Sequence, residues 1–485
     1  MPPADAHSIG TAREVDLSSW PPRHDAAYRP DPASPYWLPE IECAEPAERD
    51  RAILAKLRAQ VRYAWEKSRF YRGKWEEAGV SPDTLKSLDD LSRFPVIQKQ
   101  DLRAAQTAHP PFGDYLCVDT GQVARIHGTS GTTGRPTVFG ISSDDWQRIG
   151  EAHARILWGA GLRPSDRVLI CSFFSLYMGS WGALAGVERI GASAFPFGAG
   201  VSGQTLMAVQ WAREIRPTAF YGTPSYALHF AEIAHREGVD PSSLGFRILF
   251  FSGEPGAGIP ATKRLIEQTF GGACIDMGSM AEMTPWMTNA ECYQRQGMHL
   301  WQDVVYTQVC DPTRFQPVPY GSEGTPVYTH LERTSQPMIR LVSGDLARWT
   351  DEPCSCGRTY PRLPQGLFGR IDDMIIVRGE NIYPSAVEDV LRAISGFGGE
   401  FRIIVSRRET MDEFVVRAEL ANSHSHLKVQ IEETMRQRLQ ARLGVRPVLE
   451  LVAEGSLPRT EFKARRVIDD RDLYRKGVDQ SRHSP

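Results

Sequence analysis

The sequence has little net charge, little cysteine and no internal repeat. Its 485 residues include 56 Lys and Arg residues and 59 Asp and Glu residues, which gives a formal net charge of -3 at pH 7. Such a small charge provides no general attraction to nucleic acid or to an anionic membrane. Eight cysteines are too few to form a disulfide framework in a chain of this length. We therefore expect a cytoplasmic enzyme that binds neither nucleic acid nor membrane.

Long apolar runs are also scarce. Residues 1–16 contain none, so we expect no secretory signal. The exception is Val168 to Val187, which has no charged residue and is about as long as a membrane span. This segment is interrupted by serines and glycines, and we interpret it as a strand, a bend and the start of a helix. A membrane helix is the alternative interpretation.

The middle of the chain alternates between helical and strand-like patterns. Five amphipathic helical stretches between residues 146 and 270 are each followed by a short apolar run, as in a parallel sheet with crossover helices. Beyond about residue 291 the pieces become shorter and strand-like, which predicts a mostly antiparallel region. A further set of strands and helices over residues 374–452 predicts a small α+β domain. The fold class is α/β, with a large N-terminal domain (1–371) and a mobile α+β lid domain (372–485).

One stretch of nine residues has a composition that no hydrophobic core requires. Residues 129–137, Thr-Ser-Gly-Thr-Thr-Gly-Arg-Pro-Thr, combine hydroxyl groups, glycines and a cation. Glycine exposes backbone N–H groups to an approaching anion, and Arg135 offers a planar fork that suits phosphate oxygens. The stretch predicts a loop that closes over a polyphosphate, and a surface turn is the alternative. It is not the P-loop of nucleotide-binding proteins, because no Lys-Ser or Lys-Thr follows Gly134.

Together with later motifs, this loop resembles the adenylate-forming enzymes, and most of all the phenylacetate–CoA ligase family. The motifs that carry the resemblance, in chain order, are 127–136, 223–226 (Thr-Pro-Ser-Tyr), 252–255 (Ser-Gly-Glu-Pro), 301–303 (Trp-Gln-Asp), 344–346 (Gly-Asp-Leu), 369–373 with 378–385, and 456–463 (Ser-Leu-Pro-Arg-Thr-Glu-Phe-Lys). Each is weak alone, but their common order makes the resemblance strong. It covers the chain from about Tyr63 to Ile468.

The resemblance implies a two-step reaction. A carboxylate attacks the α-phosphate of ATP to give acyl-AMP and pyrophosphate, and the acyl group then passes to the thiol of coenzyme A. Lys463 would stabilise the charge that develops at the α-phosphate when the lid domain closes. Without the other motifs, Lys463 would be interpreted as a solvated lysine in a basic tail.

The resemblance also implies roles for other residues. The ribose hydroxyls would bind Asp345, which could otherwise simply begin a turn, and Arg370 would reach the ribose or a phosphate. Asp372 would be the hinge of the lid, and Arg378 and Gly379 would contact coenzyme A. The expected ATP and AMP contacts are Thr129, Ser130, Gly131, Thr132, Thr133, Gly134, Arg135, Gly253, Glu254, Pro255, Asp276, Met277, Gly278, Ser279, Met280, Asp345 and Arg370.

Glu282 matches the family glutamate that helps to hold Mg²⁺ against the ATP phosphates. The segment before it departs from the family pattern. Gly278 stands where an aromatic residue would stack on adenine, and Ala281 stands where a hydroxyl is usual. Phe462 replaces the glycine before the lysine, and Arg135 stands where many members have lysine. These changes affect the placement of ATP rather than the reaction class.

Three cysteines and a histidine form a candidate zinc site. Cys354 and Cys356 make a short Cys-x-Cys motif, and Cys292 and His299 lie upstream. Three thiolates and an imidazole would complete a tetrahedral structural site with no open position. Some members of the family combine the same spacings and hold zinc there. The alternative is a set of unrelated buried cysteines with a surface histidine.

The resemblance places bulky side chains in the acyl pocket. These are Phe174, Tyr177, Met178, Trp181, Tyr226 and Trp286. Trp181 stands where members that act on aryl acids carry leucine, which reduces the room for a phenyl ring. Ser175 and Tyr177 could hydrogen-bond a substrate hydroxyl. We expect a small branched or hydroxylated acid such as 2-hydroxyisobutyrate, and the alternative is that these aromatic residues only pack the core and phenylacetate still fits.

Two rival functions remain open at this stage. The activated acid could be loaded onto a carrier protein instead of coenzyme A, for which Arg378 and Arg402 would suit either phosphopantetheine carrier. Alternatively, the departures at Gly278, Ala281 and Phe462 could mark a nucleotide-binding regulator with no activity. Relatives often form dimers, so we expect a homodimer whose other partners are a small carboxylic acid, ATP and coenzyme A.

Overall fold

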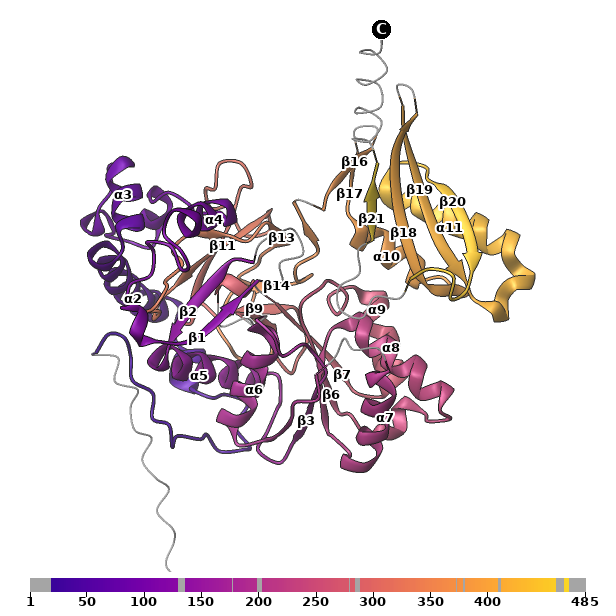
Figure 1. Cartoon of the computed structure of the whole chain (residues 1–485), viewed down its shortest axis with the longest axis horizontal. Coiled ribbons are helices and arrows are strands. Elements are labelled where there is room, and N and C mark those ends of the chain that lie inside the picture. Colours follow the sequence, from indigo (N-terminus) through magenta and orange to yellow (C-terminus); the bar gives the residue numbers. More distant parts are fainter. Residues whose placement is uncertain are drawn as a thin grey trace, which may run out of the picture.

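The computed structural model describes residues 19–129, 136–176, 178–198, 203–278, 280–283, 288–371, 373–377, 380–408, 411–458 and 466–470. It contains a large N-terminal body and a smaller C-terminal body beside helices α8 and α9 (Figure 1). The large body contains parallel and antiparallel strands, and the smaller one is α+β, so the predicted fold class is confirmed.

An eight-stranded sheet runs through the large body in the order β14-β9-β8-β7-β6-β5-β3-β4. Its parallel part contains β3 (Arg167–Ile170), β4 (Ser193–Phe195), β5 (Ala219–Gly222), β6 (Ile248–Phe251) and β7 (Ala273–Gly278). The sequence predicted these five strands. It did not predict the antiparallel extension made by β8 (Asn289–Glu291), β9 (Met298–Leu300) and β14 (Arg362–Leu363).

Helices cover both faces of this sheet. They are α5 (Ser143–Gly159), α6 (Met178–Ile190), α7 (Gln204–Ile215), α8 (Pro224–Arg236) and α9 (Pro260–Phe270). Val168 and Ile170 of β3 pack with residues of α5 and α6, whereas Leu169 packs with residues of α7, α8 and α9. This alternation is the period of two that a strand imposes on its side chains. Both faces are therefore buried, as is usual for a parallel sheet.

The N-terminal helices pack over a second, mostly antiparallel sheet. The helices are α2 (Pro46–Lys67), α3 (Arg69–Glu77) and α4 (Lys99–Ala108). The short helix α1 (Pro39–Glu42) packs instead with the core of the eight-stranded sheet. The sheet consists of β10 (Val305–Cys310), β11 (Glu323–His330), β12 (Leu341–Val342), β13 (Asp345–Arg348) and β15 (Gly369–Arg370). The periodicity of residues 44–79 predicts mostly helix, and the structure confirms this with two helices, α2 and α3. Ser68 has extended backbone and separates α2 from α3, because its hydroxyl accepts a hydrogen bond from the N–H of Tyr71 and caps α3.

A hairpin of β1 (Val123–Gly128) and β2 (Val138–Ser142) flanks the loop of residues 129–137. The hairpin was not predicted from the sequence. It fixes both ends of the loop against the large body.

Short 3₁₀ helices complete the described chain: η1 (Pro82–Thr84), η2 (Asp89–Arg93), η3 (Thr120–Gln122), η4 (Pro241–Leu244), η5 (Ala281–Met283) and η6 (Asn422–Leu427).

The smaller body, which we call the lid, has a hydrophobic core of its own. Its elements are β16 (Ile375–Val377), β17 (Glu380–Ile382), α10 (Pro384–Arg392), β18 (Phe397–Arg408), β19 (Met411–Leu420), α11 (Lys428–Leu443), β20 (Val448–Ala453) and β21 (Val467–Asp469). The main lid sheet has the order β20-β19-β18-β21. A domain boundary after residue 371 stays a prediction.

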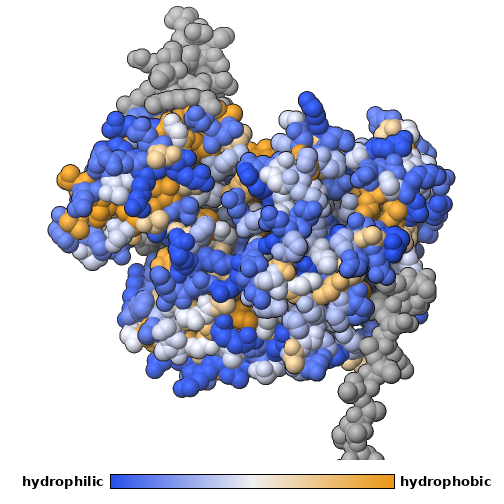
Figure 2. Space-filling view, turned by 180° about the vertical axis from the view of Figure 1, so that it is seen from behind, coloured by the Kyte–Doolittle hydropathy of each residue, from blue (hydrophilic) through white to orange (hydrophobic). Residues whose placement is uncertain are grey.

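The uncharged segment Val168–Val187 folds as strand β3 and helix α6, in agreement with our interpretation. The sequence pattern predicts a helix over residues 182–190, and helix α6 begins four residues earlier, at Met178. Among the described residues, no helix is long and apolar enough to cross a membrane. Figure 2 shows a mostly hydrophilic surface with apolar side chains gathered on the lid, where Val429 and Ile376 are exposed.

We predict that His153 makes folding sensitive to acid. Burial lowers the pKa of this fully buried imidazole to about 4, whereas the ordinary value is 6.5. As the pH falls below 6.5, the unfolded chain therefore binds a proton that the folded chain does not bind until the pH nears 4. Stability is lost across this window, by about 2 kcal/mol at pH 5 relative to neutral pH.

Denaturant unfolding of wild type and His153→Gln at pH 7 and pH 5 measures this effect. The loss between the two pH values should shrink by about 2 kcal/mol in the variant. His235→Gln, at an exposed position on α8, is the matched control and should keep the full loss. An equal loss in His153→Gln and wild type would contradict the prediction.

Candidate active site

The hydroxyl-rich loop is closed at its base by a pair of hydrogen bonds. The N–H of Thr129 donates to the carbonyl of Thr137 over 2.9 Å, and the N–H of Thr137 donates to Oγ1 of Thr129 over 3.1 Å. The next residue back, Gly128, donates its N–H to the carbonyl of Leu176 over 2.8 Å. The base of the loop, at Thr129 and Thr137, thereby lies beside the segment that precedes α6, where the acyl pocket is expected.

The loops after β5 and β6 meet at the carboxyl edge of the parallel sheet, the usual place for a ligand site. Thr223 caps α8 by accepting a hydrogen bond from the N–H of Tyr226 over 3.2 Å. Gly253 has a φ of +96°, which favours glycine, and places Glu254 beside α8. Glu254 accepts a hydrogen bond from the N–H of Ser225 over 2.8 Å, and burial raises the pKa of its carboxyl.

At the end of β7, the expected nucleotide contacts have different surroundings. The side chains of Met277 and Met280 pack in hydrophobic cores, which leaves their backbone for a ligand. The carboxylate of Asp276 is enclosed so closely that a Cβ added at Gly258 would lie 2.6 Å from its Oδ2. Burial, followed by the charge of Glu291, holds the pKa of Asp276 well above its usual range.

Gly278 leaves space where the family has an aromatic residue. A Cβ placed there would lie 3.4 Å from Cδ1 of Leu367 and 3.9 Å from Cε of Met298. These two side chains form an apolar surface next to the missing ring.

Glu282 has the surroundings that a magnesium ligand requires. It is 2 % exposed, and its Oε1 has no hydrogen-bond partner among the described residues. The nearest cation is Lys99 of α4, whose Nζ lies 3.8 Å from that oxygen. A buried, unbonded carboxylate oxygen suits Mg²⁺. Sequence reasoning missed Lys99, because a single lysine at the start of an amphipathic helix gives no sign of a site.

Asp345 and Arg370 lie directly opposite each other. They form a pair in the register between β13 and β15, so two residues that are 25 positions apart share one edge. The N–H of Asp345 donates to Oγ of Ser343 over 3.0 Å, and Arg370 lies 3.6 Å from Asp373. A carboxylate and a guanidinium at one position would suit a ribose beside a phosphate, and the roles of Asp345 and Arg370 stay predictions.

The structure brings together part of the predicted acyl pocket. The rings of Phe174 and Trp181 meet edge to face with centroids 5.1 Å apart, and Nε1 of Trp181 donates to the carbonyl of Ser175 over 2.8 Å. Met178 is fully buried beneath Trp181. Tyr226 lies in the core on the opposite face of the sheet, near Cys171.

Sequence reasoning did not identify an aromatic stack next to these residues. The His127 ring is stacked on Trp146 at 5.8 Å and lies 6.1 Å from Trp181, and the Arg125 guanidinium sits 4.0 Å from the centre of the Trp146 ring. Burial lowers the pKa of His127 to about 4, so the imidazole is neutral at pH 7. Its position directly before the loop was the only available indication.

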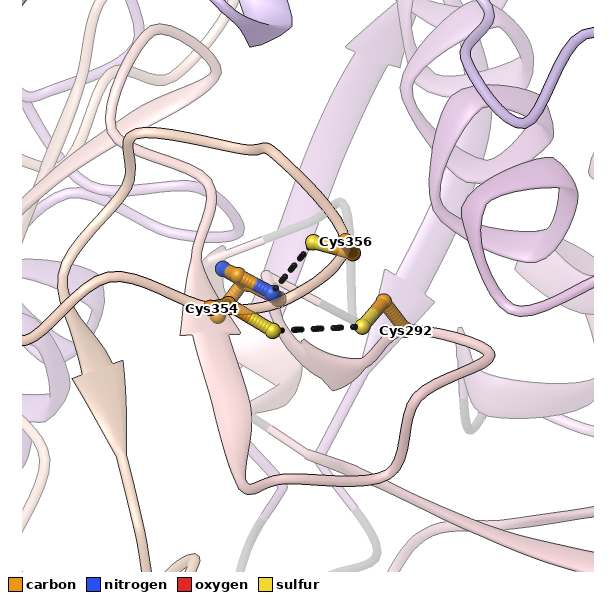
Figure 3. Close-up of side chains that lie close together, drawn as sticks. Cys292, Cys354 and Cys356 are labelled. Atoms are coloured by element: carbon orange, nitrogen blue, oxygen red, sulfur yellow. Dashed lines mark hydrogen bonds between the residues drawn. The ribbon is translucent and has the colours of Figure 1, made fainter.

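The predicted zinc ligands come together from three separate segments (Figure 3). Cys292, His299, Cys354 and Cys356 are all buried, and their ligand atoms lie within 4.8 Å of one another. The Sγ atoms of Cys292 and Cys354 are 3.9 Å apart, and Sγ of Cys356 is 3.4 Å from Nε2 of His299. Zinc–sulfur bonds of about 2.3 Å require tetrahedral ligands about 3.8 Å apart, so the cluster fits the ion.

Several predicted residues lie outside the described part of the chain. They are Ser130, Gly131, Thr132, Thr133, Gly134, Arg135, Tyr177, Ser279, Trp286, Asp372, Arg378, Gly379 and Lys463. Their roles stay predictions.

Comparison with known proteins identifies the family. Residues 50–328 match the model of the AMP-binding enzymes, and residues 379–471 match that of the AMP-binding enzyme C-terminal domain. The chain is 34% identical over 452 residues to the phenylacetate-coenzyme A ligase of Thermus thermophilus, which covers 89% of this chain and 99% of the relative. It is 33% identical over 442 residues to the Escherichia coli enzyme of the same name, and this match covers 90% of this chain and 98% of the relative.

Solved structures extend the comparison. A crystal structure of 2-hydroxyisobutyryl-CoA ligase in the postadenylation state, in complex with 2-HIB-AMP, is 54% identical, covers 97% of this chain and 99% of its own, and gives a TM-score of 0.92. A structure of the same ligase with 2-HIB-AMP and CoA in the thioesterification state is 54% identical and gives a TM-score of 0.73. The match covers 96% of this chain and 99% of that structure's chain.

The motifs, the two-domain fold and the length over which the relatives match agree with one another. The chain therefore belongs to the phenylacetate–coenzyme A ligase family of AMP-binding enzymes, and it is an adenylate-forming acid–CoA ligase.

Proposed function

We propose that this ligase activates a small branched or hydroxylated acid, such as 2-hydroxyisobutyrate. The observation that carries the proposal is Trp181, which is anchored to Ser175 and packed edge to face on Phe174. An indole held in this way occupies volume that a phenyl ring would need. The likeness to 2-hydroxyisobutyryl-CoA ligase over nearly the whole chain supports the same substrate class.

In the adenylation step, the loop of residues 129–135 binds the β- and γ-phosphates of ATP. Asp345 accepts hydrogen bonds from the ribose hydroxyls, and Arg370 contacts the ribose or a phosphate. Glu282 would hold Mg²⁺, which would supply positive charge to neutralise the phosphates. The carboxylate of the acid attacks the α-phosphate and pyrophosphate leaves, while Lys463 from the lid stabilises the charge that develops.

In the second step, the lid turns about Asp372 and the thiol of coenzyme A enters past Arg378 and Gly379. The sulfur attacks the acyl carbonyl, the thiol proton is lost, and AMP leaves as the acyl–oxygen bond breaks. Phenylacetate remains the alternative substrate, because the identified relatives carry that name. A carrier protein remains the alternative acceptor.

We also propose that the enzyme is a cytoplasmic homodimer with a structural zinc ion. All eight cysteines are free, which suits a reducing compartment. The zinc would connect the segment after β8 to the loop of residues 354–356. That loop in turn accepts a hydrogen bond at the carbonyl of Cys356 from the hydroxyl of Tyr36, over 2.6 Å.

The proposed function is tested by pyrophosphate release. Wild type is assayed with ATP, Mg²⁺ and CoA over a panel of acids that includes acetate, 2-hydroxyisobutyrate and phenylacetate. We expect release with the short hydroxylated acids, and a rate about 100-fold lower for Lys463→Ala, because one transition-state cation is removed. Release that is fastest with phenylacetate would contradict the substrate class, and no release with any acid would favour the regulator. Transfer to a purified carrier protein but not to CoA would identify the other acceptor.

We predict that Trp181→Leu changes the preference among acids. The smaller side chain opens room for a phenyl ring, so kcat/KM should rise about tenfold for phenylacetate and fall for 2-hydroxyisobutyrate, which loses packing. Trp211→Leu, at an exposed tryptophan on α7, should leave both values unchanged. Equal effects of Trp181→Leu on the two acids would contradict a role in selection.

We predict that the purified protein contains about one zinc per chain. Metal analysis of Cys356→Ser should find almost no zinc, because the three remaining ligands cannot complete the tetrahedral site. The Tm should also be lower, because the zinc no longer connects the three segments that carry its ligands. Cys310→Ser removes a buried thiol outside the cluster and should retain zinc. Metal-free wild-type protein with an unchanged Tm would contradict a structural zinc.

A further inference from the structure

Strand β1 presents two side chains to the helices beside the expected acyl pocket. Arg125 and His127 are two positions apart, so they lie on the same face of the strand. That face meets Trp146 of helix α5 and Trp181 of helix α6 (Figure 1). Ile126, between them, lies on the opposite face and is 53 % exposed. The strand that leads into the hydroxyl-rich loop therefore also contacts a tryptophan that we place in the acyl pocket.

The guanidinium of Arg125 is shared between the two indoles. Its Cζ atom lies 4.0 Å from the centre of the Trp146 ring and 5.7 Å from the centre of the Trp181 ring. Both distances fall within the range of about 6 Å over which a cation is attracted to the face of an aromatic ring. Within the described ranges of the chain, these rings and not a carboxylate are the partners of Arg125.

His127 contacts the same two indoles through its ring. It is stacked on Trp146 with an angle of 11° between the ring planes and a centroid distance of 5.8 Å, and its centroid is 6.1 Å from that of Trp181. The side chain is buried, and burial lowers the pKa of the imidazole to about 4. His127 is therefore neutral at pH 7 and packs as an aromatic ring, which lets it lie beside the charge of Arg125.

Trp181 is thereby held from two directions. On the side of its own helix, Phe174 meets the indole edge to face at 5.1 Å, and the carbonyl of Ser175 accepts a hydrogen bond from Nε1 over 2.8 Å. On the side of β1, Arg125 and His127 contact the ring. Loss of the contacts from β1 would leave the indole attached along one side only.

The two tryptophans also share a small hydrophobic core. Both pack against Ile141 of β2, Ile149 of α5 and Met178 of α6, all of which are buried. Because interiors are closely packed, a shift of one indole changes the space that is available to the other. Trp146 therefore transmits the contacts of β1 to Trp181.

The position of β1 along the chain adds a link to the phosphate site. The strand ends at Gly128, whose N–H donates to the carbonyl of Leu176 over 2.8 Å, between Ser175 and the start of α6. One strand therefore supports both the base of the loop of residues 129–137 and the indole in the expected acyl pocket. The two sites share a support at the place where the carboxylate of the acid must meet the α-phosphate.

We propose that Arg125 and His127 are positioning residues that fix the indole of Trp181 against the acyl pocket and thereby determine which acids fit. The inference rests on the proposed function, in which Trp181 limits the room for the acid. It extends that function because the support for the indole comes from β1, outside the pocket. Neither Arg125 nor His127 needs to touch the acid.

The test is the ratio of the kcat/KM values for phenylacetate and for the short acid that wild type uses best. Arg125→Met removes the charge but keeps an apolar side chain, and His127→Ala removes the stacked ring. Each should raise the ratio about threefold, less than the tenfold or so expected for Trp181→Leu, because Phe174 and Ser175 still hold the indole. His127→Phe keeps a planar ring in the stack and should restore a ratio near that of wild type.

Double variants show whether the two residues act through Trp181. In a Trp181→Leu background, Arg125→Met and His127→Ala should change the ratio no further, because the side chain that they position is absent. An Arg125 that instead bound the carboxylate of the acid would affect every acid alike, since all acids carry that group. The matched control is Arg163→Met, whose guanidinium lies 4.1 Å from the centre of the Trp158 ring, and it should leave the ratio unchanged.

Three results would overturn the inference alone. They are a ratio that neither Arg125→Met nor His127→Ala changes although Trp181→Leu does, equal losses with both acids, and a shift that persists in the Trp181→Leu background. A disturbed phosphate loop gives the second result, because it raises the KM for ATP with either acid. If His127→Ala does not fold, Arg125→Met decides the outcome. A ratio that Trp181→Leu itself leaves unchanged would overturn the selection of acids by Trp181 in the proposed function, and this inference with it.

Discussion

The separation of the hydrophobic cores is the constraint on which the rest of this structure depends. The buried apolar residues of the lid, from Ile375 to Leu449, pack with one another and not with the cores of the large body. Each body can then turn without exposing a core, because apolar burial is satisfied within it. Groups needed in only one half-reaction can therefore be placed on the lid.

Burial of the strand side chains also determines where the site residues of the large body lie. Alternate side chains of β3, β5, β6 and β7 pack into the cores on the two faces of the sheet. The residues that can bind a ligand are therefore those that follow the ends of the strands. Gly253, Glu254 and Glu282 all lie after strand ends. The hairpin of β1 and β2 that flanks residues 129–137 does not belong to this sheet, and the hydrogen bond from Gly128 to the carbonyl of Leu176 connects it to the segment before α6.

The sequence predicted the parallel strands and the strands and helices of the lid, because each has a periodic pattern that local physics imposes. The grouping of Cys292 and His299 with Cys354 and Cys356 was predicted through the resemblance to the family. It failed where the structure depends on distant partners. Strands β8, β9 and β14 span two or three residues, too few to show a period, and they form only because β7 offers an open edge. Lys99 and the stack of His127 on Trp146 have no sequence signature, since only the tertiary fold brings Lys99 to Glu282. Ser68 interrupts a helix that periodicity alone would continue.

A lid that must be held and then released needs a weak restraint. Two apolar faces would cost about 25 cal/mol for each Å² exposed on separation, so a modest contact would already slow the rotation. Ion pairs in contact with water contribute only about 1 kcal/mol each, because water screens them. Polar contacts of this kind between the lid and the large body would bias the position of the lid and leave the barrier to its rotation low.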